Sequence, residues 1–292
     1  MANIGIVLAG AASKGAYEIG CLRAIEERFG KQNIKYVCSA SVGALIGQAY
    51  GMGKMEDLTA KWQSLDVKKH GRFFLSYSGN GDILEMIDDL LSEKSPIPFE
   101  HHVSIWNFTK SKVEYIPFHE LPISRVREYM KGAIAIPFFS KGEVVDGDRI
   151  LDGAFLDNIP VYPLLDKDVD YIFCIYFDNC KYFFEDESFN RKMIKMYDFP
   201  NEQMLGLMTY KPERFEGMMQ YGYDYMNRTI DEIFVSDEPE VVYEAIKVWD
   251  SQKTTTYKPR LTADLVLNNI NVMTKRYSKR LTNRTLEKST DK

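Results

Sequence analysis

Residues 3–30, NIGIVLAGAASKGAYEIGCLRAIEERFG, contain an apolar run, a turn of small residues and a helical pattern in direct succession. Residues 4–9 are apolar and lead into glycine, which is typical of a buried parallel strand. The helical pattern comes from apolar residues three or four positions apart: Ile19, Leu22, Ile25 and Phe29. Gly30 follows the last of them, at a position where glycine commonly ends a helix. The stretch therefore predicts a strand followed by a helix.

The same order recurs in residues 34–50, IKYVCSASVGALIGQAY. Residues 34–38 are expected to form a second short strand, and residues 42–50 a second helix. Strand, helix, strand and helix at this spacing favour a parallel sheet with helices on its faces.

The later part of the chain predicts more strands and helices. A strand pair is expected over 103–109 and 112–118, and another buried strand over 171–177. Residues 143–151 read as a hairpin, because Asp146-Gly147 suits a turn with positive φ. Helices are also expected over 82–92, 213–228 and 241–249, and apolar residues recur at helical spacing over 266–281.

The composition is that of an ordinary soluble protein, with 45% hydrophobic and 27% charged residues among 292. The net charge of −5 argues against a nucleic-acid-binding protein. No apolar run approaches the roughly 18 residues of a membrane-spanning helix, and the N-terminus lacks the basic region of a signal peptide. The four cysteines show no metal-ligand spacing and are expected to be free thiols in a reducing compartment: Cys21, Cys38, Cys174 and Cys180. A cytoplasmic protein is expected.

Ser41 lies between the second strand and its helix, in the sequence Ser-Ala-Ser-Val-Gly at 39–43. In a G-x-S-x-G nucleophile elbow, small flanking residues let strand and helix approach while the serine oxygen is exposed above the sheet. Ser39 replaces the first glycine of that pattern. The stretch fits either a nucleophile or an incidental turn of small residues.

The histidines are poorly placed for a Ser–Asp–His triad. All four precede residue 120: His70, His101, His102 and His119. The obvious acid, Asp152, comes later, whereas the α/β-hydrolase order places the histidine after the acid. Either Ser41 is not catalytic, or a carboxylate acts directly as its base. Asp152 follows an apolar strand and precedes Gly153, but a plain turn aspartate, such as Asp146, would have the same local composition.

The loop at residues 10–15, GAASKG, has the glycine spacing of a phosphate loop, but Ala16-Tyr17 stands where Lys-Ser or Lys-Thr is required. A loop between a strand and a helix N-terminus still offers backbone N–H groups to an anion, as an oxyanion hole does. Lys14 fits either a source of positive charge there or an exposed turn lysine.

Together these motifs resemble the patatin-like phospholipases, a family of serine acyl hydrolases. GAASKG matches the family's glycine loop, SASVG its elbow, AIAIPFF at 133–139 its proline-containing segment, and LDGAFLDNIPVYPL at 151–164 its D-G-[GA] motif. The resemblance implies a three-layer α/β/α sandwich with a mostly parallel sheet. It runs from residue 3 to about 228, so we expect an acyl hydrolase domain over 1–228 and a C-terminal helical extension over 229–292.

The resemblance also implies roles for individual residues. Ser41 would be the nucleophile and Asp152 the base, with no histidine, metal or organic cofactor. The oxyanion hole would be formed by the amides of Gly10, Ala11 and Ala12. The supporting residues would be Lys14, Gly15, Gly43 and Gly153. The implied activity is cleavage of acyl esters, of the phospholipase A or esterase type, on phospholipid or another acyl-ester lipid.

Two alternatives stay open. Because Ala11, Ala12 and Ser39 replace family glycines, the protein could be a weak or inactive lipid-binding member of the fold. It could also be an esterase with a histidine-containing triad. A lipid substrate requires at least transient contact with a membrane surface, so peripheral contact is expected. The methionines of 193–226 and the basic residues of 275–284 could serve such contact, or could be helix core and a solvated face.

Overall fold

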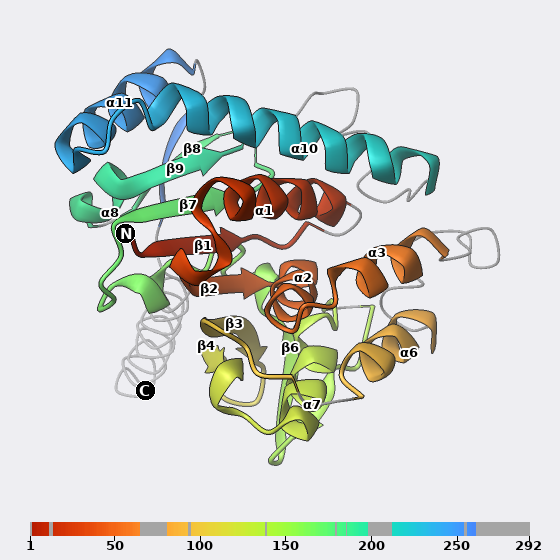
Figure 1. Cartoon of the computed structure of the whole chain (residues 1–292). Helices are drawn as coiled ribbons and strands as arrows, with labels where there is room; N and C mark the ends of the chain where they lie inside the picture. Colours follow the sequence, from red (N-terminus) through yellow and green to blue (C-terminus); the bar gives the residue numbers. More distant parts are fainter. Residues whose placement is uncertain are drawn as a thin grey trace, which may run out of the picture.

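The computed structural model shows a mostly parallel sheet between layers of helices and short turns (Figure 1). It describes residues 2–11, 14–64, 81–92, 95–137, 139–178, 180–184, 186–197, 212–253 and 256–260. In this part of the chain the strand order is β5-β6-β3-β2-β1-β7-β9, with β4 also paired to β3. β8 and β10 form a separate parallel pair.

The strands and helices have the following bounds. The strands are β1 (Ile4–Leu8), β2 (Ile34–Ala40), β3 (Glu100–Asn107), β4 (Lys112–Pro117), β5 (Glu143–Val145), β6 (Asp148–Asp152), β7 (Tyr171–Ile175), β8 (Lys181–Phe184), β9 (Met193–Met196) and β10 (Tyr257–Arg260). The α-helices are α1 (Gly15–Phe29), α2 (Val42–Gly51), α3 (Met55–Ser64), α6 (Gly81–Leu90), α7 (Ile123–Ala133), α8 (Glu187–Lys192), α10 (Pro212–Ile233) and α11 (Pro239–Gln252). The short 3₁₀ turns are η2 (Lys31–Asn33), η3 (Phe118–Glu120), η4 (Gly153–Phe155) and η5 (Tyr162–Leu164).

The predicted strand–helix–strand–helix start is confirmed. β1 is parallel to both β2 and β7, so it lies in the middle of the sheet. Every residue of β1 is buried, as expected for a strand covered on both faces. α1 ends at Phe29, and Gly30 adopts the positive φ of 80° that favours glycine at a helix end.

Two apolar clusters lie on opposite faces of the sheet. Ile6 and Leu8 of β1 belong to the cluster that packs α1, α2, α7 and α10 on one face (Figure 1). Val7 and Ala9 alternate with them and join the cluster under η5 and α8. The predicted three-layer architecture is therefore confirmed. The layer that contains η5 and α8 consists mainly of short turns and loops.

The predicted hairpins are confirmed. β3 and β4 are antiparallel, and so are β5 and β6. Asp146 and Gly147 have φ values of 51° and 84° between β5 and β6, as a two-residue turn with positive φ requires.

β2 and β6 meet end to end along β3. β4 pairs with residues 102–107 of β3 and so occupies one side of that strand. On the other side, Ala40 at the end of β2 lies opposite Ser104, and Asp152 at the end of β6 lies opposite Ile105. The two strands run toward each other and stop at neighbouring positions of β3. The residue after Ala40 therefore comes close to Asp152.

The C-terminal part has only partly described structure. α10 packs along α1, where the Cys21 thiol lies 3.5 Å from the carbonyl oxygen of Gly222. α10 continues past residue 228, and β10 pairs with β8. The division at 228/229 stays a prediction, and the segment 266–281 and the basic segment 275–284 lie outside the described residues. Within the described residues, no helix combines the length and apolar character needed to cross a bilayer.

Candidate active site

Ser41 occupies a strained turn between β2 and α2. Its φ of 53° and ψ of −127° lie in a region that non-glycine residues rarely adopt. Such strain costs on the order of 1–3 kcal/mol and tends to mark functional sites. A Cβ on Gly43 would lie 2.7 Å from the carbonyl oxygen of Leu8, so glycine is needed for α2 to pack against β1. The predicted sharp strand-to-helix turn is therefore present.

Asp152 is buried at the end of β6, with 4% of its surface exposed. Its backbone N–H donates to the carbonyl oxygen of Ala135, 2.9 Å away, in the proline-containing segment. One carboxylate oxygen accepts the N–H of Ala154 at 2.9 Å. A Cβ on Gly153 would lie 2.4 Å from the backbone of Ser104, so this glycine permits the turn to lie on β3.

The side chains of Ser41 and Asp152 are in hydrogen-bond contact. Burial raises the pKa of Asp152 to about 7, while the hydrogen bonds from Ser41 and from the Ala154 N–H act in the opposite direction. Near neutral pH, this carboxyl group can therefore both accept and release a proton. Asp146, by contrast, has an exposed side chain that pairs with Arg125. The two aspartates that composition could not separate thus have different environments.

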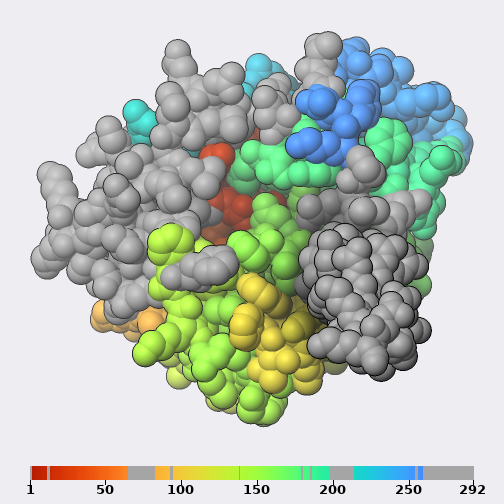
Figure 2. Space-filling model, turned by 180° about the vertical axis from the view of Figure 1, so that it is seen from behind, coloured from red at the N-terminus to blue at the C-terminus, as the bar shows by residue number. Residues whose placement is uncertain are grey.

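The glycine loop adjoins this pair. A Cβ on Gly10 would lie 2.7 Å from the Cβ of Ala154 and 3.0 Å from the Cβ of Ser41. The N–H of Gly10 donates to the side-chain oxygen of Asn158 at 2.7 Å. Loop, elbow and the turn after Asp152 therefore converge at one place. From the opposite side of the molecule, red atoms of the N-terminal part reach the surface beside green atoms from the middle of the chain (Figure 2).

Ala11 is buried and carries no left-handed backbone strain. Among the non-glycine residues that the structure describes, positive φ occurs at Ser41, Ser111 and Asp146 only. Alanine at position 11 is thus compatible with the loop conformation, and its N–H is retained. Ala12, the other alanine that replaces a family glycine, lies outside the described residues.

Lys14 and Gly15 begin α1 at the edge of the site. Lys14 is not an exposed turn lysine, because only 1% of it is accessible and its Nζ lies 5.2 Å from the ring centre of Phe177. Burial lowers the pKa of Lys14 to about 8, and the charge of Asp178 partly opposes that effect. Below about pH 8, Lys14 therefore carries its positive charge beside Phe177.

A buried polar network behind the elbow was not predicted from the sequence. Nε2 of His101 lies 2.7 Å from the hydroxyl of Ser39, and Nδ1 lies 3.1 Å from the side-chain oxygen of Gln48. Because an amide oxygen only accepts, Nδ1 carries the proton and the Ser39 hydroxyl donates to Nε2. Ser39, the departure from the family glycine, therefore helps to tie β2, β3 and α2 together.

The other histidines lie elsewhere or outside the described residues. The ring of His102 lies against that of His119, with 5.3 Å between ring centres. His70 lies outside the described residues. Both ring nitrogens of His101 are engaged by Ser39 and Gln48. The only sequence signal for this network is a polar side chain at an otherwise apolar strand position, which does not reveal its partners.

His101 is expected to make the protein sensitive to acid. Burial lowers the pKa of His101 to about 3, and the nearby charges of His102 and His119 lower it further. The unfolded chain binds a proton below about pH 6.5, whereas the folded chain does not, so stability falls as pH decreases through 6.5. We expect this group to remove about 2 kcal/mol from the free energy of unfolding at pH 5. Urea unfolding at pH 7 and pH 5 should show a smaller loss in His101→Gln; equal losses would contradict the prediction.

In the described part of the chain, no group of three or more His, Cys, Asp or Glu side chains is arranged to hold a metal ion. All four cysteines are free thiols, as predicted, and the structure shows that all four are buried.

Comparison with known proteins places the chain in a family. The family model for patatin-like phospholipase matches residues 6–165, more than half of the chain. The chain belongs to the patatin-like phospholipase family. The match contains the loop, the elbow, Asp152 and Asn158.

Similar curated proteins include an uncharacterized NTE family protein of Mycobacterium tuberculosis, 25% identical over 178 residues, which are 58% of this chain and 47% of that protein. The lysophospholipase NTE1 of Mycosarcoma maydis is 26% identical over 187 residues, which are 59% of this chain and 10% of that protein. The chain thus spans about half the length of the mycobacterial relative and a small part of the fungal one.

Similar solved structures include VipD from Legionella pneumophila, with a TM-score of 0.43 and 16% identity, covering 79% of this chain and 67% of VipD. The type III effector protein ExoU has a TM-score of 0.43 and 13% identity, covering 84% of this chain and 53% of ExoU.

Proposed function

We propose that the protein is a lipid acyl hydrolase of the phospholipase A or esterase type, using Ser41 as nucleophile and Asp152 as base. The observation that carries the proposal is the contact between a serine held at positive φ and a buried carboxyl group whose pKa burial raises to about 7. Membership of the patatin-like phospholipase family supports a lipid ester substrate.

The proposed reaction has two steps. The Asp152 carboxylate takes the proton of Ser41 as its oxygen attacks the ester carbonyl, and Asp152 then gives that proton to the departing alcohol. Water next attacks the acyl-serine and gives one proton to Asp152. Asp152 then returns this proton to the Ser41 oxygen as the free acid leaves. A base whose pKa lies near the working pH suits both directions of transfer.

The oxyanion of each tetrahedral intermediate needs nearby N–H donors. The N–H of Gly10 already donates a hydrogen bond to Asn158. We therefore assign the role of oxyanion donor to the next two amides of the loop, at Ala11 and Ala12. Lys14, which follows the loop in sequence and lies against Phe177, is proposed to support this part of the site with its positive charge. In this arrangement Asn158 positions the loop rather than contacting the substrate.

Asn158→Ala is therefore expected to lower kcat by about tenfold to a hundredfold with little change in KM, because the loop loses its anchor while the dyad remains. Asn158→Asp keeps an oxygen that accepts from Gly10 and should retain more activity than the alanine variant. Steady-state kinetics on a soluble ester measures both. Equal kcat in Asn158→Ala and the wild type would show that the loop needs no such anchor.

The substrate proposed is a phospholipid or another acyl-ester lipid, met by a cytoplasmic protein at a membrane surface. Hydrolysis of a short and a long p-nitrophenyl acyl ester tests the proposal, with Ser41→Ala and Asp152→Asn beside the wild type. Turnover that both substitutions abolish supports the dyad. Turnover that survives both, or that requires a histidine, would reject it. A wild type as slow as its variants would favour an inactive lipid-binding protein.

A further inference from the structure

The corner formed by β3, β4 and β6 carries aromatic side chains that remain open to water. The rings of Trp106 and Phe155 are stacked with 5.5 Å between centres, and Phe108 meets Trp106 edge-on at 5.3 Å. Phe108 is 50% exposed and Phe155 54% exposed. The water-facing side of an antiparallel corner usually carries polar side chains, and clustered exposed apolar groups mark binding surfaces. We call Trp106, Phe108 and Phe155 the aromatic ridge.

The aromatic ridge is continuous with the candidate active site. Phe155 lies in η4, the turn that begins directly after Asp152. Ala154, in the same turn, donates its N–H to the Asp152 carboxylate. Trp106 lies opposite Leu151, the residue before Asp152. Yellow atoms of the β3–β4 region are visible on the side of the molecule shown in Figure 2. Any partner that contacts the ridge would therefore lie beside the turn that holds Asp152.

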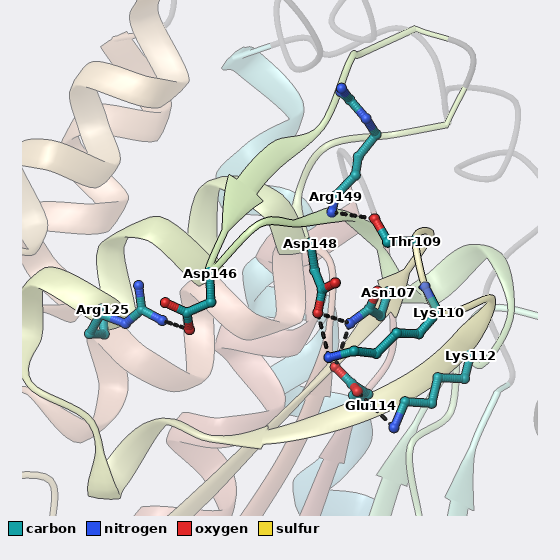
Figure 3. Close-up of polar contacts among 9 residues, drawn as sticks. All are labelled: Asn107, Thr109, Lys110, Lys112, Glu114, Arg125, Asp146, Asp148 and Arg149. Atoms are coloured by element: carbon teal, nitrogen blue, oxygen red, sulfur yellow. Dashed lines mark hydrogen bonds and ion pairs between the residues drawn. The ribbon is translucent and has the colours of Figure 1, made fainter.

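Figure 3 shows the charged side chains of the β3–β4 and β5–β6 turns, on the strands that carry the ridge. The Asp148 side chain is 19% exposed, and one oxygen lies 2.5 Å from the ammonium of Lys110, which is 53% exposed. The Glu114 side chain is 21% exposed and pairs at 2.8 Å with Lys112, which is 49% exposed. The backbone N–H of Arg149 donates to Thr109, and its side chain extends away from these acids in Figure 3. The two lysine pairs lie on the Asn107 face of β3, which is opposite to the face of Trp106, because side chains alternate along a strand. Arg149 is two residues from Leu151, the partner of Trp106, and so shares the face of the ridge.

We propose that the aromatic ridge, with Arg149 on the same face, docks the protein on a phospholipid bilayer, a role that rests on the proposed lipid hydrolase function. Tryptophan and phenylalanine favour the boundary between headgroups and acyl chains, and arginine favours lipid phosphates. Docking here brings the turn that holds Asp152 to the interface, where an acyl ester has only a short way to travel to Ser41.

Tryptophan fluorescence can locate the contact. Of the three tryptophans, Trp62 is 1% exposed and Trp249 7% exposed, whereas Trp106 stacks in the ridge. Vesicles of brominated phosphatidylcholine mixed with phosphatidylglycerol quench indoles that enter the bilayer. The wild type and Ser41→Ala should both be quenched, and Trp106→Phe should not. Quenching that persists in Trp106→Phe would place the contact elsewhere and overturn the proposal.

Vesicle cosedimentation supplies a second measurement with a matched control. Phe108→Ser should lower the partition coefficient about tenfold, because a half-exposed ring can no longer leave water. Phe183, which is 48% exposed at the end of β8, is the control, and Phe183→Ser should bind like the wild type. Equal losses in both variants, or none in either, would reject the ridge as the docking surface.

The two proposals can fail separately. A soluble p-nitrophenyl ester needs no surface, so its hydrolysis by the wild type tests the Ser41–Asp152 chemistry alone. Hydrolysis without vesicle binding would contradict the proposed docking surface and leave the proposed catalytic function unaffected. Ridge-dependent binding without hydrolysis would instead reject the catalytic proposal and support a lipid-binding protein.

Discussion

Ser41→Ala is expected to lower the rate of ester hydrolysis by about four orders of magnitude or more, because no other group can form the acyl intermediate at this position. Alanine has the same backbone preferences as serine, so the strained turn at φ 53° is kept and only the reacting oxygen is lost. Initial rates on a soluble ester measure the effect. Retention of more than about a hundredth of the rate would mean that Ser41 is not the nucleophile.

Ser41→Gly separates strain from chemistry. It should be as inactive as Ser41→Ala, yet unfold at higher urea, with a free energy of unfolding about 1 kcal/mol greater than that of the alanine variant, because glycine tolerates positive φ. Ser111 is the matched control, since it has a φ of 54° in the β3–β4 turn. Ser111→Gly should also gain stability relative to Ser111→Ala, but both should keep full activity on a soluble ester.

The local parts of this site could be predicted from the sequence because they depend on neighbouring residues. The apolar run at 4–9 and the glycines at 10, 15 and 43 together require a strand, a turn and a close helix, and the structure has them in that order. Such features follow from burial and from the space that only glycine leaves.

The meeting of Ser41 with Asp152 could not be derived from local pattern. It depends on β6 returning antiparallel and stopping at Ile105 of β3, next to the end of β2. That placement is a long-range pairing, and nothing in the residues around Asp152 specifies its partner strand. The family resemblance anticipated the pair; the topology gives the physical reason for its contact.

The network of Ser39, His101 and Gln48 shows a different limit. A serine in place of the elbow glycine looks like a defect when the motif is read alone. In the structure its hydroxyl donates to a buried histidine that would otherwise lack a partner on that ring nitrogen. Removing a hydrogen-bond partner from a buried polar group costs about 1–3 kcal/mol, so this serine is tied to the packing of β2 on β3.

Asp152→Asn is expected to abolish hydrolysis as fully as Ser41→Ala, because an amide cannot take the serine proton near neutral pH. In the wild type, burial raises the pKa of Asp152 to about 7, so kcat/KM should rise with pH through about 7 and then level off as the carboxylate forms. Rates measured from pH 5 to 9 would show this limb. A flat profile, or active Asp152→Asn, would show that Asp152 is not the base.

Asp152→Asn should abolish activity, yet it should make the protein more stable relative to the wild type as pH rises. Because burial raises the pKa of Asp152 above the unfolded value of 3.8, the folded state holds a proton that the unfolded state has released. The stability that this proton provides is complete below about pH 4 and is lost as pH rises through about 7, by on the order of 3–4 kcal/mol. An amide at this position stays neutral throughout, so Asp152→Asn should lose less stability than the wild type between pH 5 and pH 8. Urea unfolding at the two pH values measures the difference. An inactive variant that gains relative stability above pH 7 is the result expected of a carboxylate kept buried for catalysis, whereas an inactive variant that is destabilised at every pH would indicate a purely structural aspartate.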